Sequence, residues 1–401
     1  MKKKILFVIN TLGRGGAENA LIQLINNIDK NIYDISLYVI LGQGELIEKI
    51  PKHVHILNKK FDHASVLSKE GKKNLRKNII GIAFSRFSFF KNFFYLLTNF
   101  FRMMFSGKIF VDKLLWKMLS DGSDILSEEY DLATAFLEGA STYYVRDHVR
   151  AKKKVAFIHV NYLEAGYNRK LDKNVYLDMD KIFAVSEDVR KSFLSEYSEC
   201  KDKTYIFENI LDVKSIIKKS EESGGFDDAF DGKRILTIAR LTAQKAIDVS
   251  IDACRILLDK GEDVKWYVLG DGDLRTKLEE KIKKEGLTDR FILFGVKDNP
   301  YPYLKQCDLY VHATKFEGKS IAIREAQVLG KPIIVSDCPS NLELVVSGED
   351  ALVTKLDAKA ISDTIIKLLH DENLCTELGE KARIKDNDGQ DSLDELLNLV
   401  R

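Results

Sequence analysis

Short apolar segments typical of β-strands alternate with helical patterns along this chain of 401 residues, and this alternation limits the fold more than any other feature. A strand, a helix and a further strand in succession favour a parallel sheet with helices on both faces. The pattern therefore predicts an α/β protein. Thirteen strands are expected, at 4–9, 34–40, 54–58, 131–136, 154–159, 181–186, 203–209, 234–239, 264–270, 290–295, 308–313, 331–336 and 351–354.

Two series of strands indicate two domains, which a chain of this length can form. The polar segment 218–225 lies between the two series and has the composition of a linker. We predict a first domain at 1–213, with a helical insertion at 64–121, and a second domain at 214–385. A capping-box sequence at Ser392 predicts a last helix.

The composition argues against several classes of protein. The net charge of +1 gives no overall field that would attract nucleic acid. The five cysteines lie far apart, which fits free thiols in a reducing cytosol better than a disulfide or zinc framework. The apolar segment 5–9 is too short for a signal peptide, and we expect no membrane-spanning helix. These features predict a cytoplasmic protein that does not bind nucleic acid.

Two carboxylates follow the expected strand at 308–313. Glu317 lies in a glycine-containing turn, and Glu325 lies about two helical turns later. Ligands of open α/β sheets bind at the carboxyl ends of the strands. Two carboxylates at such an edge suit a ligand rich in hydroxyl groups, such as a sugar nucleotide. The alternative is an ordinary helix whose acidic first turn complements its dipole.

Two cations follow the expected strand at 234–239. Arg240 and Lys245 can neutralise a diphosphate, and the guanidinium fork adds directional hydrogen bonds. A solvated basic loop is the alternative. Asp271 and Asp273 could be taken for a metal site, but their setting favours a turn into a helix. We therefore expect cationic side chains, and no metal ion, to neutralise the ligand.

Glycines follow the first strand. Gly15 and Gly16 would let backbone amides approach a ligand at a helix N-terminus, although a tight turn would also explain them. The dinucleotide-binding G-x-G-x-x-G order is absent, so a Rossmann dehydrogenase is disfavoured. His159 closes the strand at 154–159 and could act as an acid, a base or a hydrogen-bond donor near neutral pH, or could be structural. We expect the remaining histidines to be structural or surface residues: His53, His55, His63, His148, His312 and His370.

The segment 84–110 departs from the alternating pattern. It is rich in phenylalanine, with Arg86, Lys91 and Arg102 in between. Aromatic and basic residues together suit helices that lie on an anionic membrane surface. The alternative is a helical insertion whose aromatic side chains fill the domain core.

These features together resemble the GT-B glycosyltransferases, and specifically the large retaining family 4 in its bacterial surface-polysaccharide branch. The resemblance covers nearly the whole chain. It is most specific in the pair Glu317 and Glu325, with Arg240 and Lys245 upstream. The resemblance implies two Rossmann-like domains facing a cleft, with a C-terminal helix at 386–401 that crosses back to the first domain.

The resemblance also implies roles for individual residues. Glu317 and His159 would be catalytic and lie against the donor sugar. The residues that would bind the nucleotide-sugar donor or shape its site are Arg240, Lys245, Glu325, Gly15, Gly16, Lys319, Ser320 and Ile321. Among them, Arg240 and Lys245 would hold the diphosphate and Glu325 the ribose. No cofactor other than the donor substrate is implied.

The function implied is transfer of a hexose or N-acetylhexosamine from a nucleotide-diphospho-sugar to a saccharide or lipid-linked acceptor, with retention, at the inner face of the membrane. Two departures from the family pattern affect the donor site. Ala246 stands where the family often has glycine, and Lys319 and Ser320 stand where it often has Phe-Gly. A sugar-nucleotide epimerase of the same fold and a non-catalytic partner subunit are the alternatives.

Overall fold

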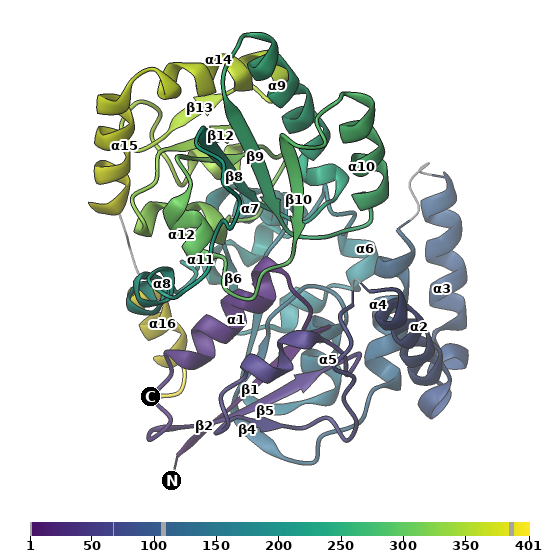
Figure 1. Cartoon of the computed structure of the whole chain (residues 1–401). Coiled ribbons are helices and arrows are strands. Elements are labelled where there is room, and N and C mark those ends of the chain that lie inside the picture. Colours follow the sequence, from purple (N-terminus) through teal and green to yellow (C-terminus); the bar gives the residue numbers. More distant parts are fainter. Residues whose placement is uncertain (1, 67, 106–109, 385–388) are drawn as a thin grey trace. The chain divides into compact units, whose positions relative to one another are not determined.

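The computed structural model describes residues 2–66, 68–105, 110–384 and 389–401 (Figure 1). The chain divides into two compact units. Unit 1 comprises Met1–Ile210 and Gly389–Arg401, and unit 2 comprises Leu211–Asp388.

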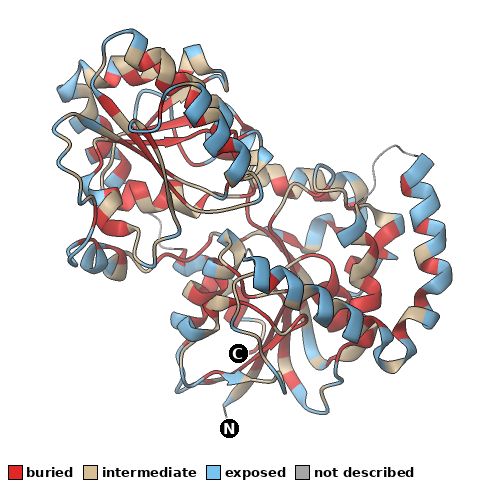
Figure 2. Ribbon diagram, turned by 45° about the vertical axis from the view of Figure 1, so that its right-hand side comes forward, coloured by how far each residue is buried: buried red, intermediate tan, exposed pale blue. Residues whose placement is uncertain are grey.

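Unit 1 contains a seven-stranded sheet with the order β3-β2-β1-β4-β5-β6-β7, in which all neighbours are parallel. Its strands are β1 (Lys3–Ile9), β2 (Tyr33–Val39), β3 (His55–Ile56), β4 (Glu129–Ala135), β5 (Arg150–Ile158), β6 (Lys181–Ala184) and β7 (Thr204–Ile206). Its helices are α1 (Gly16–Asn26), α2 (Lys69–Phe84), α3 (Ser88–Phe105), α4 (Val111–Gly122), α5 (Ala140–His148), α6 (Arg169–Asp172), α7 (Glu187–Glu196) and α16 (Gln390–Leu397). Residues 5–9 of β1 are all buried (Figure 2), as expected of a parallel sheet that is covered on both faces.

Unit 2 contains a six-stranded parallel sheet with the order β10-β9-β8-β11-β12-β13. Its strands are β8 (Lys233–Ile238), β9 (Val264–Leu269), β10 (Phe291–Gly295), β11 (Leu309–His312), β12 (Ile333–Ser336) and β13 (Leu352–Thr354). Its helices are α8 (Val213–Ser220), α9 (Ile247–Asp259), α10 (Arg275–Lys284), α11 (Tyr301–Gln306), α12 (Ile321–Val328), α13 (Pro339–Leu342), α14 (Ala358–Leu369) and α15 (Glu372–Ile384).

All thirteen predicted strands are present, which confirms the α/β class. β3 is shorter than predicted because it lies at the edge of its sheet and pairs with β2 alone. None of the described helices is long and apolar enough to cross a bilayer.

The predicted linker at 218–225 is partly wrong, because its first residues complete α8. The side chain of Asp212 caps this helix by accepting from the Ser215 N–H at 2.9 Å. Ile216 is buried against Tyr301 and Val328 of α11 and α12. Apolar contacts thus order the helix, and Lys218 and Lys219, which helped to suggest a linker, are exposed on it.

The last helix, α16, belongs to unit 1. Lys181 Nζ of β6 lies 2.6 Å from Glu395 Oε1. The capping role predicted for Ser392 is wrong, because the helix begins at Gln390 with Gly389 as its N-cap. Ser392 Oγ instead accepts a hydrogen bond from the backbone N–H of Glu208 at 2.8 Å.

Candidate functional site

The candidate site of unit 2 lies where the strand order reverses. β8 lies between β9 and β11, although β11 comes two strands later along the chain than β9. Such a switch point opens a crevice beyond the carboxyl ends of the strands, where ligands of α/β sheets bind. Arg240 follows β8 and Glu317 follows β11, so the topology brings both predicted residues to this crevice.

The loops after β8 and β11 are hydrogen-bonded to each other. The Lys315 N–H donates to the Gln244 carbonyl at 2.9 Å, and Gln244 Nε2 donates to the Phe316 carbonyl at 2.7 Å. The loop after β8 contains a 3₁₀ turn, Ala243–Lys245, which places Lys245 beside the second loop. These hydrogen bonds hold the two loops together.

Lys245, His312 and Glu317 form the centre of the site. Lys245 Nζ forms an ion pair with Glu317 Oε2, and His312 Nε2 lies 3.3 Å from the same oxygen. His312 Nδ1 lies 3.1 Å from Tyr310 Oη. His312 was expected to be a structural or surface residue; it is buried, and it contacts two of the predicted site residues.

The electrostatics of this cluster follow from its burial. Burial, followed by the positive charge of Arg240, lowers the pKa of Lys245 to about 7, and the Glu317 carboxylate in contact with it opposes that shift. Burial also holds the pKa of His312 well below its ordinary value, with Lys245 adding to the effect. At neutral pH the His312 ring is therefore uncharged.

Arg240 differs from Lys245 in its surroundings. Its side chain is exposed, and within the described ranges it forms no ion pair. An exposed guanidinium beside a buried ammonium can bind an anion at two depths of the same crevice.

The turn that carries Glu317 leads into α12. Ser320 is the N-cap, and its Oγ accepts from the Ile323 N–H at 3.4 Å. The backbone N–H groups that begin the helix, at 319–321, lie at its positive end, where anions bind favourably.

Glu325 has a different partner. The hydroxyl of Tyr301 on α11 donates to Glu325 Oε1 at 2.8 Å. Burial raises the pKa of Tyr301, and the Glu325 carboxylate raises it further, so the phenol stays a donor. The two predicted carboxylates are thus held by separate contacts, one at the start of α12 and one inside it.

Two glycines after β9 support the Arg240 loop. A Cβ atom on Gly270 would lie 2.0 Å from the Ala239 carbonyl oxygen, and one on Gly272 would lie 2.5 Å from the Leu241 carbonyl oxygen. Asp271 Oδ1 accepts from Arg275 Nε at 3.0 Å. In the part of the chain that the structure describes, no three His, Cys, Asp or Glu side chains are grouped to hold a metal ion.

Unit 1 has its own switch point, between β1 and β4. Gly15 is the N-cap of α1 with extended backbone, so its φ does not require glycine. A Cβ atom on Gly15 would lie 2.2 Å from Glu18 Oε2, whereas one on Gly16 would meet nothing within 4 Å. Gly16 is also exposed, so its backbone is open to a ligand.

His159 lies at the same edge of unit 1. Its ring packs on Phe136 and Phe157, with centroids 4.9 and 5.8 Å away, and its Nε2 has no hydrogen-bond partner in the described structure. Burial lowers the pKa of His159 to about 3, and a backbone hydrogen bond to Phe136 opposes the shift. At neutral pH the ring is uncharged, so of the predicted roles hydrogen bonding fits this setting best.

Glu138 is a further residue at this edge, and no role was predicted for it. This buried carboxylate accepts hydrogen bonds from the backbone N–H groups of His159 and Val160, at 2.5 and 3.0 Å. Asn10 connects the segment to β1, because its Nδ2 donates to the Glu138 carbonyl at 2.8 Å. Burial raises the pKa of Glu138, and the backbone donors oppose that shift. Glu138 therefore fixes the backbone that carries His159.

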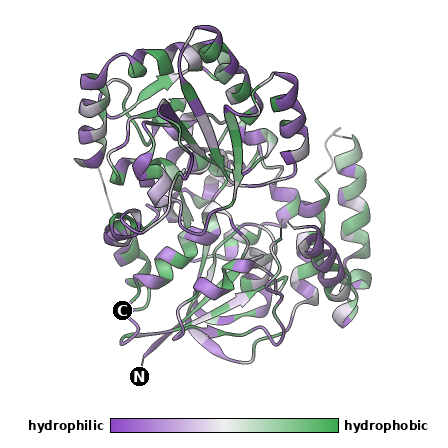
Figure 3. Ribbon diagram, viewed as in Figure 1, coloured by the Kyte–Doolittle hydropathy of each residue, from purple (hydrophilic) through white to green (hydrophobic). Residues whose placement is uncertain are grey.

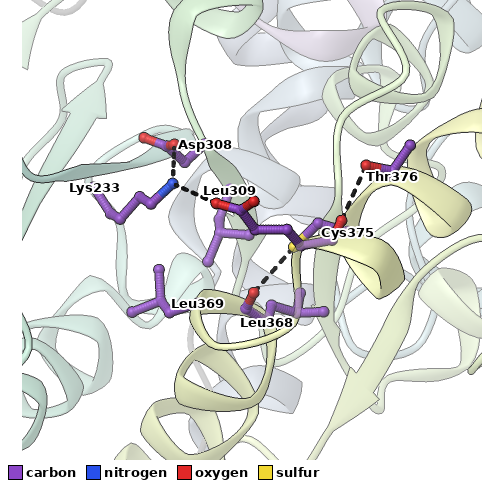
Figure 4. Close-up of a pocket in the computed structure, with 8 residues that line it drawn as sticks. Lys233, Asp308, Leu309, Leu368, Leu369, Cys375 and Thr376 are labelled. Atoms are coloured by element: carbon purple, nitrogen blue, oxygen red, sulfur yellow. Dashed lines mark hydrogen bonds and ion pairs between the residues drawn. The ribbon is translucent and has the colours of Figure 1, made fainter.

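A cavity of about 250 Å³ lies elsewhere in unit 2 (Figure 4). Lys233 and Asp308, which line it, stand at the amino ends of β8 and β11, the opposite edge from Glu317. Lys233 Nζ lies 3.3 Å from Asp308 Oδ1 and 4.0 Å from Glu372 Oε1. Two carboxylates face one ammonium here, so this cavity does not favour an anionic ligand.

Comparison with known proteins identifies the second unit. The profile of the family described as Glycosyl transferases group 1 matches residues 220–385. The poly(ribitol-phosphate) alpha-N-acetylglucosaminyltransferase of Staphylococcus aureus is 25% identical over 260 residues, which are 62% of this chain and 50% of that protein.

A second relative acts on a lipid-linked saccharide according to its name. The N-acetylgalactosamine-N,N'-diacetylbacillosaminyl-diphospho-undecaprenol 4-alpha-N-acetylgalactosaminyltransferase of Campylobacter jejuni is 27% identical over 232 residues, which are 56% of this chain and 62% of that protein. The chain spans about half the length of curated relatives that it matches.

Solved structures share the fold over the whole chain. HepE of Anabaena in complex with UDP-glucose matches with a TM-score of 0.68 and 16% sequence identity, over 98% of each chain. The chain therefore has the two-domain α/β fold of the GT-B glycosyltransferases, and its residues 220–385 match the group 1 glycosyl transferase family.

Proposed function

We propose that this protein transfers a hexose or N-acetylhexosamine from a nucleotide-diphospho-sugar to a saccharide or lipid-linked acceptor, with retention, in the synthesis of a surface polysaccharide. The contact of Lys245, His312 and Glu317 at the switch point of unit 2 carries this proposal. The curated relatives named above support it, since both are glycosyltransferases by name.

The cations of the crevice would bind the donor diphosphate. Arg240 is exposed and Lys245 is buried beneath it, so phosphate oxygens could meet both. The backbone N–H groups at 319–321 would add donors from the start of α12. As the bond to the sugar breaks, negative charge grows on the diphosphate, and preorganised positive groups stabilise this transition state. These groups need no metal ion or further cofactor.

The carboxylates would bind the two sugars of the donor. Glu325 lies inside α12 and would accept hydrogen bonds from the ribose hydroxyls. Glu317 would lie against the transferred sugar, held in place by Lys245 and His312. A diphosphate that attracts Lys245 would also weaken its ion pair with Glu317 and leave that carboxylate available to the sugar.

Unit 1 would supply the acceptor side of the reaction. The unpartnered Nε2 of the neutral His159 can accept a hydrogen bond from a sugar hydroxyl. The open backbone at Gly16, next to Gly15, would border the same space. We place the reaction in the cytoplasm at the inner face of the membrane, in keeping with the diphospho-undecaprenol acceptor in the name of the C. jejuni relative.

The test begins with a thermal-shift screen of the full chain against a panel of nucleotide sugars, because a ligand that binds only the folded state raises the unfolding temperature. Transfer from the donor so found is then measured with Glu317→Gln, Lys245→Met and Arg240→Ala. We expect the rate to fall at least about 100-fold in each, the scale of losing one transition-state donor.

Matched controls are the exposed residues Lys260 and Glu280 of the same unit, changed as Lys260→Met and Glu280→Gln, which should leave transfer unchanged. Folded Glu317→Gln and Lys245→Met variants with the wild-type rate would refute the proposed roles. Conversion of the donor without any acceptor would instead identify an epimerase.

A further inference from the structure

An ordinary surface helix turns its apolar side chains to the core. Helix α3 (Ser88–Phe105) does the opposite: most of its buried side chains are polar, and its apolar side chains face outward. Its buried side chains are Ser88, Asn92, Tyr95, Asn99 and Met103. Its exposed apolar side chains are Phe90, Phe93, Phe94, Leu97, Phe100, Phe101, Met104 and Phe105. Figures 2 and 3 show this helix exposed along its length and largely hydrophobic. The alternative that these aromatic side chains fill the domain core is therefore wrong.

Hydrogen bonds fix the rotation of α3. Ser88 Oγ donates to the Met118 carbonyl at 2.6 Å, and Asn92 Nδ2 donates to Asp121 Oδ2 at 2.9 Å. Tyr95 Oη donates to the Leu171 carbonyl at 2.9 Å. A rotation that buried the phenylalanines would leave these polar groups without partners, which is costly. The hydrogen bonds of the buried polar face thus keep the aromatic face of α3 turned outward.

The exposed side chains form one stripe. Phe90, Phe94, Leu97, Phe101 and Met104 recur every three or four residues, so they lie along one face of the helix. Phe90 is 65% exposed and Phe94 is 78% exposed. A continuous apolar stripe of this kind marks an interaction surface.

The charge around the stripe points to the kind of partner. Residues 69–105, which span α2 and α3, contain eight basic residues and one acidic residue, a net charge of +7 against +1 for the whole chain. Lys91 and Arg102 are exposed on α3, and the exposed face of α2 carries Lys73, Arg76 and Lys77. An apolar stripe flanked by basic residues is complementary to a partner that has an apolar interior beneath an anionic surface.

We propose that α3 lies in the surface of an anionic lipid bilayer, with its phenylalanine stripe among the acyl chains and the basic residues of α2 and α3 at the headgroups. Basic amphipathic helices with aromatic apolar faces bind membranes in this way. The helix cannot span the bilayer. A second copy of the chain fits less well, since a symmetric interface would bring two regions of charge +7 together.

The proposal deepens the function inferred above, because it would hold unit 1 at the plane in which a lipid-linked acceptor diffuses. Its test is independent of sugar transfer. The full chain is sedimented with vesicles of phosphatidylglycerol and phosphatidylcholine, and with vesicles of phosphatidylcholine alone. We expect binding to the anionic vesicles that weakens as salt is raised.

Two double variants separate the two parts of the surface. Phe90→Ser/Phe94→Ser should reduce the partition coefficient at least about tenfold, because it removes apolar area that would enter the bilayer. Lys73→Glu/Lys77→Glu should reduce it roughly tenfold or more on anionic vesicles and have no effect on neutral ones. Ile32→Ser/Ile125→Ser is the matched control, since both isoleucines are exposed in unit 1 outside α3, and it should bind as the wild type does.

Circular dichroism and transfer to a soluble acceptor check that each variant is folded. Wild-type protein that does not sediment with anionic vesicles would overturn the proposal, as would undiminished binding by the phenylalanine variant. Equal binding to neutral vesicles would overturn the part assigned to the basic residues. Self-association lost in the phenylalanine variant, without vesicle binding, would assign the stripe to a second copy of the chain.

Discussion

At the scale of single residues, Ala246 is one of the few non-glycine positions with a positive φ, and it follows a predicted site residue. It has φ 44° and ψ 37°, a left-handed conformation, and it is fully buried between Lys245 and α9. The family that this chain resembles often has glycine there. An alanine in this conformation costs about 1–2 kcal/mol relative to glycine.

We predict that Ala246→Gly changes the free energy of unfolding by less than about 1 kcal/mol. The strain relieved is offset by the lost burial of a methyl group, about 0.8 kcal/mol, and by the greater freedom of glycine in the unfolded chain, roughly 0.5–1 kcal/mol. Ala246→Val, which adds β-branching in the same backbone conformation, should destabilise by about 2 kcal/mol or more. Urea unfolding of both variants measures the difference. A loss above about 2 kcal/mol in the glycine variant would show that packing of the methyl group dominates.

Individual site residues were predictable to the extent that they follow strands. Arg240, Lys245 and Glu317 were found because each lies just beyond an apolar segment, and the structure brings them to one crevice. His312 ends β11 as His159 follows β5, so the signal that selected His159 applied to both. Glu138 also lies just beyond a strand, β4, but its contacts are with backbone groups of a neighbouring strand, which a single sequence does not show.

At the scale of elements, the turn after β9 holds the loop that carries Arg240. Gly270 has φ +146°, and a Cβ atom there would overlap the Ala239 carbonyl. We predict that Gly270→Ala shifts this loop and weakens donor binding at least about tenfold, since misplaced binding groups lose much of their effect. Calorimetry with the donor found by thermal shift measures the affinity.

Gly261→Ala is the control for this prediction. Gly261 has φ +85° and nothing within 4 Å of the added atom, so the variant carries backbone strain without touching the loop. It should lose stability of about 1 kcal/mol and keep its donor affinity. Equal weakening of donor binding in both variants would mean that strain, and not the position of the Arg240 loop, controls affinity.

Some elements could be predicted from the hydrophobic pattern of the sequence, and others could not. Most of the strands are buried apolar runs of a parallel sheet, and such runs can be predicted from a single sequence. α8 looked like a linker because its few apolar residues are surrounded by lysines, and contacts with α11 and α12 order it. The rotation of α3 was equally hidden, because the sequence shows that one face is aromatic but not that the polar face is the buried one.

At the scale of the whole molecule, the order of the strands decides where the site forms. The sequence gives the succession of strands, and only the pairing of β8 with β11 shows that Arg240 and Glu317 follow neighbouring strands. The last helix also depends on a long-range contact. Its predicted start at Ser392 was wrong, because Ser392 Oγ accepts a hydrogen bond from the backbone N–H of Glu208. Long-range pairing of this kind leaves no local pattern in a single sequence.

The last helix gives a prediction about the stability of each unit. Leu396 of α16 is fully buried in unit 1, and Glu395 beside it pairs with Lys181 of β6. We predict that Leu396→Ala destabilises unit 1 by about 2–5 kcal/mol, the cost of a cavity at a buried leucine. Hydrogen exchange measured by mass spectrometry should then show lost protection in β6 and β7 and unchanged protection in β8 to β13.

Leu368→Ala, which changes a buried leucine of α14, is the reciprocal control and should affect unit 2 alone. Loss of protection in unit 2 on changing Leu396 would mean that the two units unfold together, and α16 would then stabilise the whole chain instead of the unit to which it belongs.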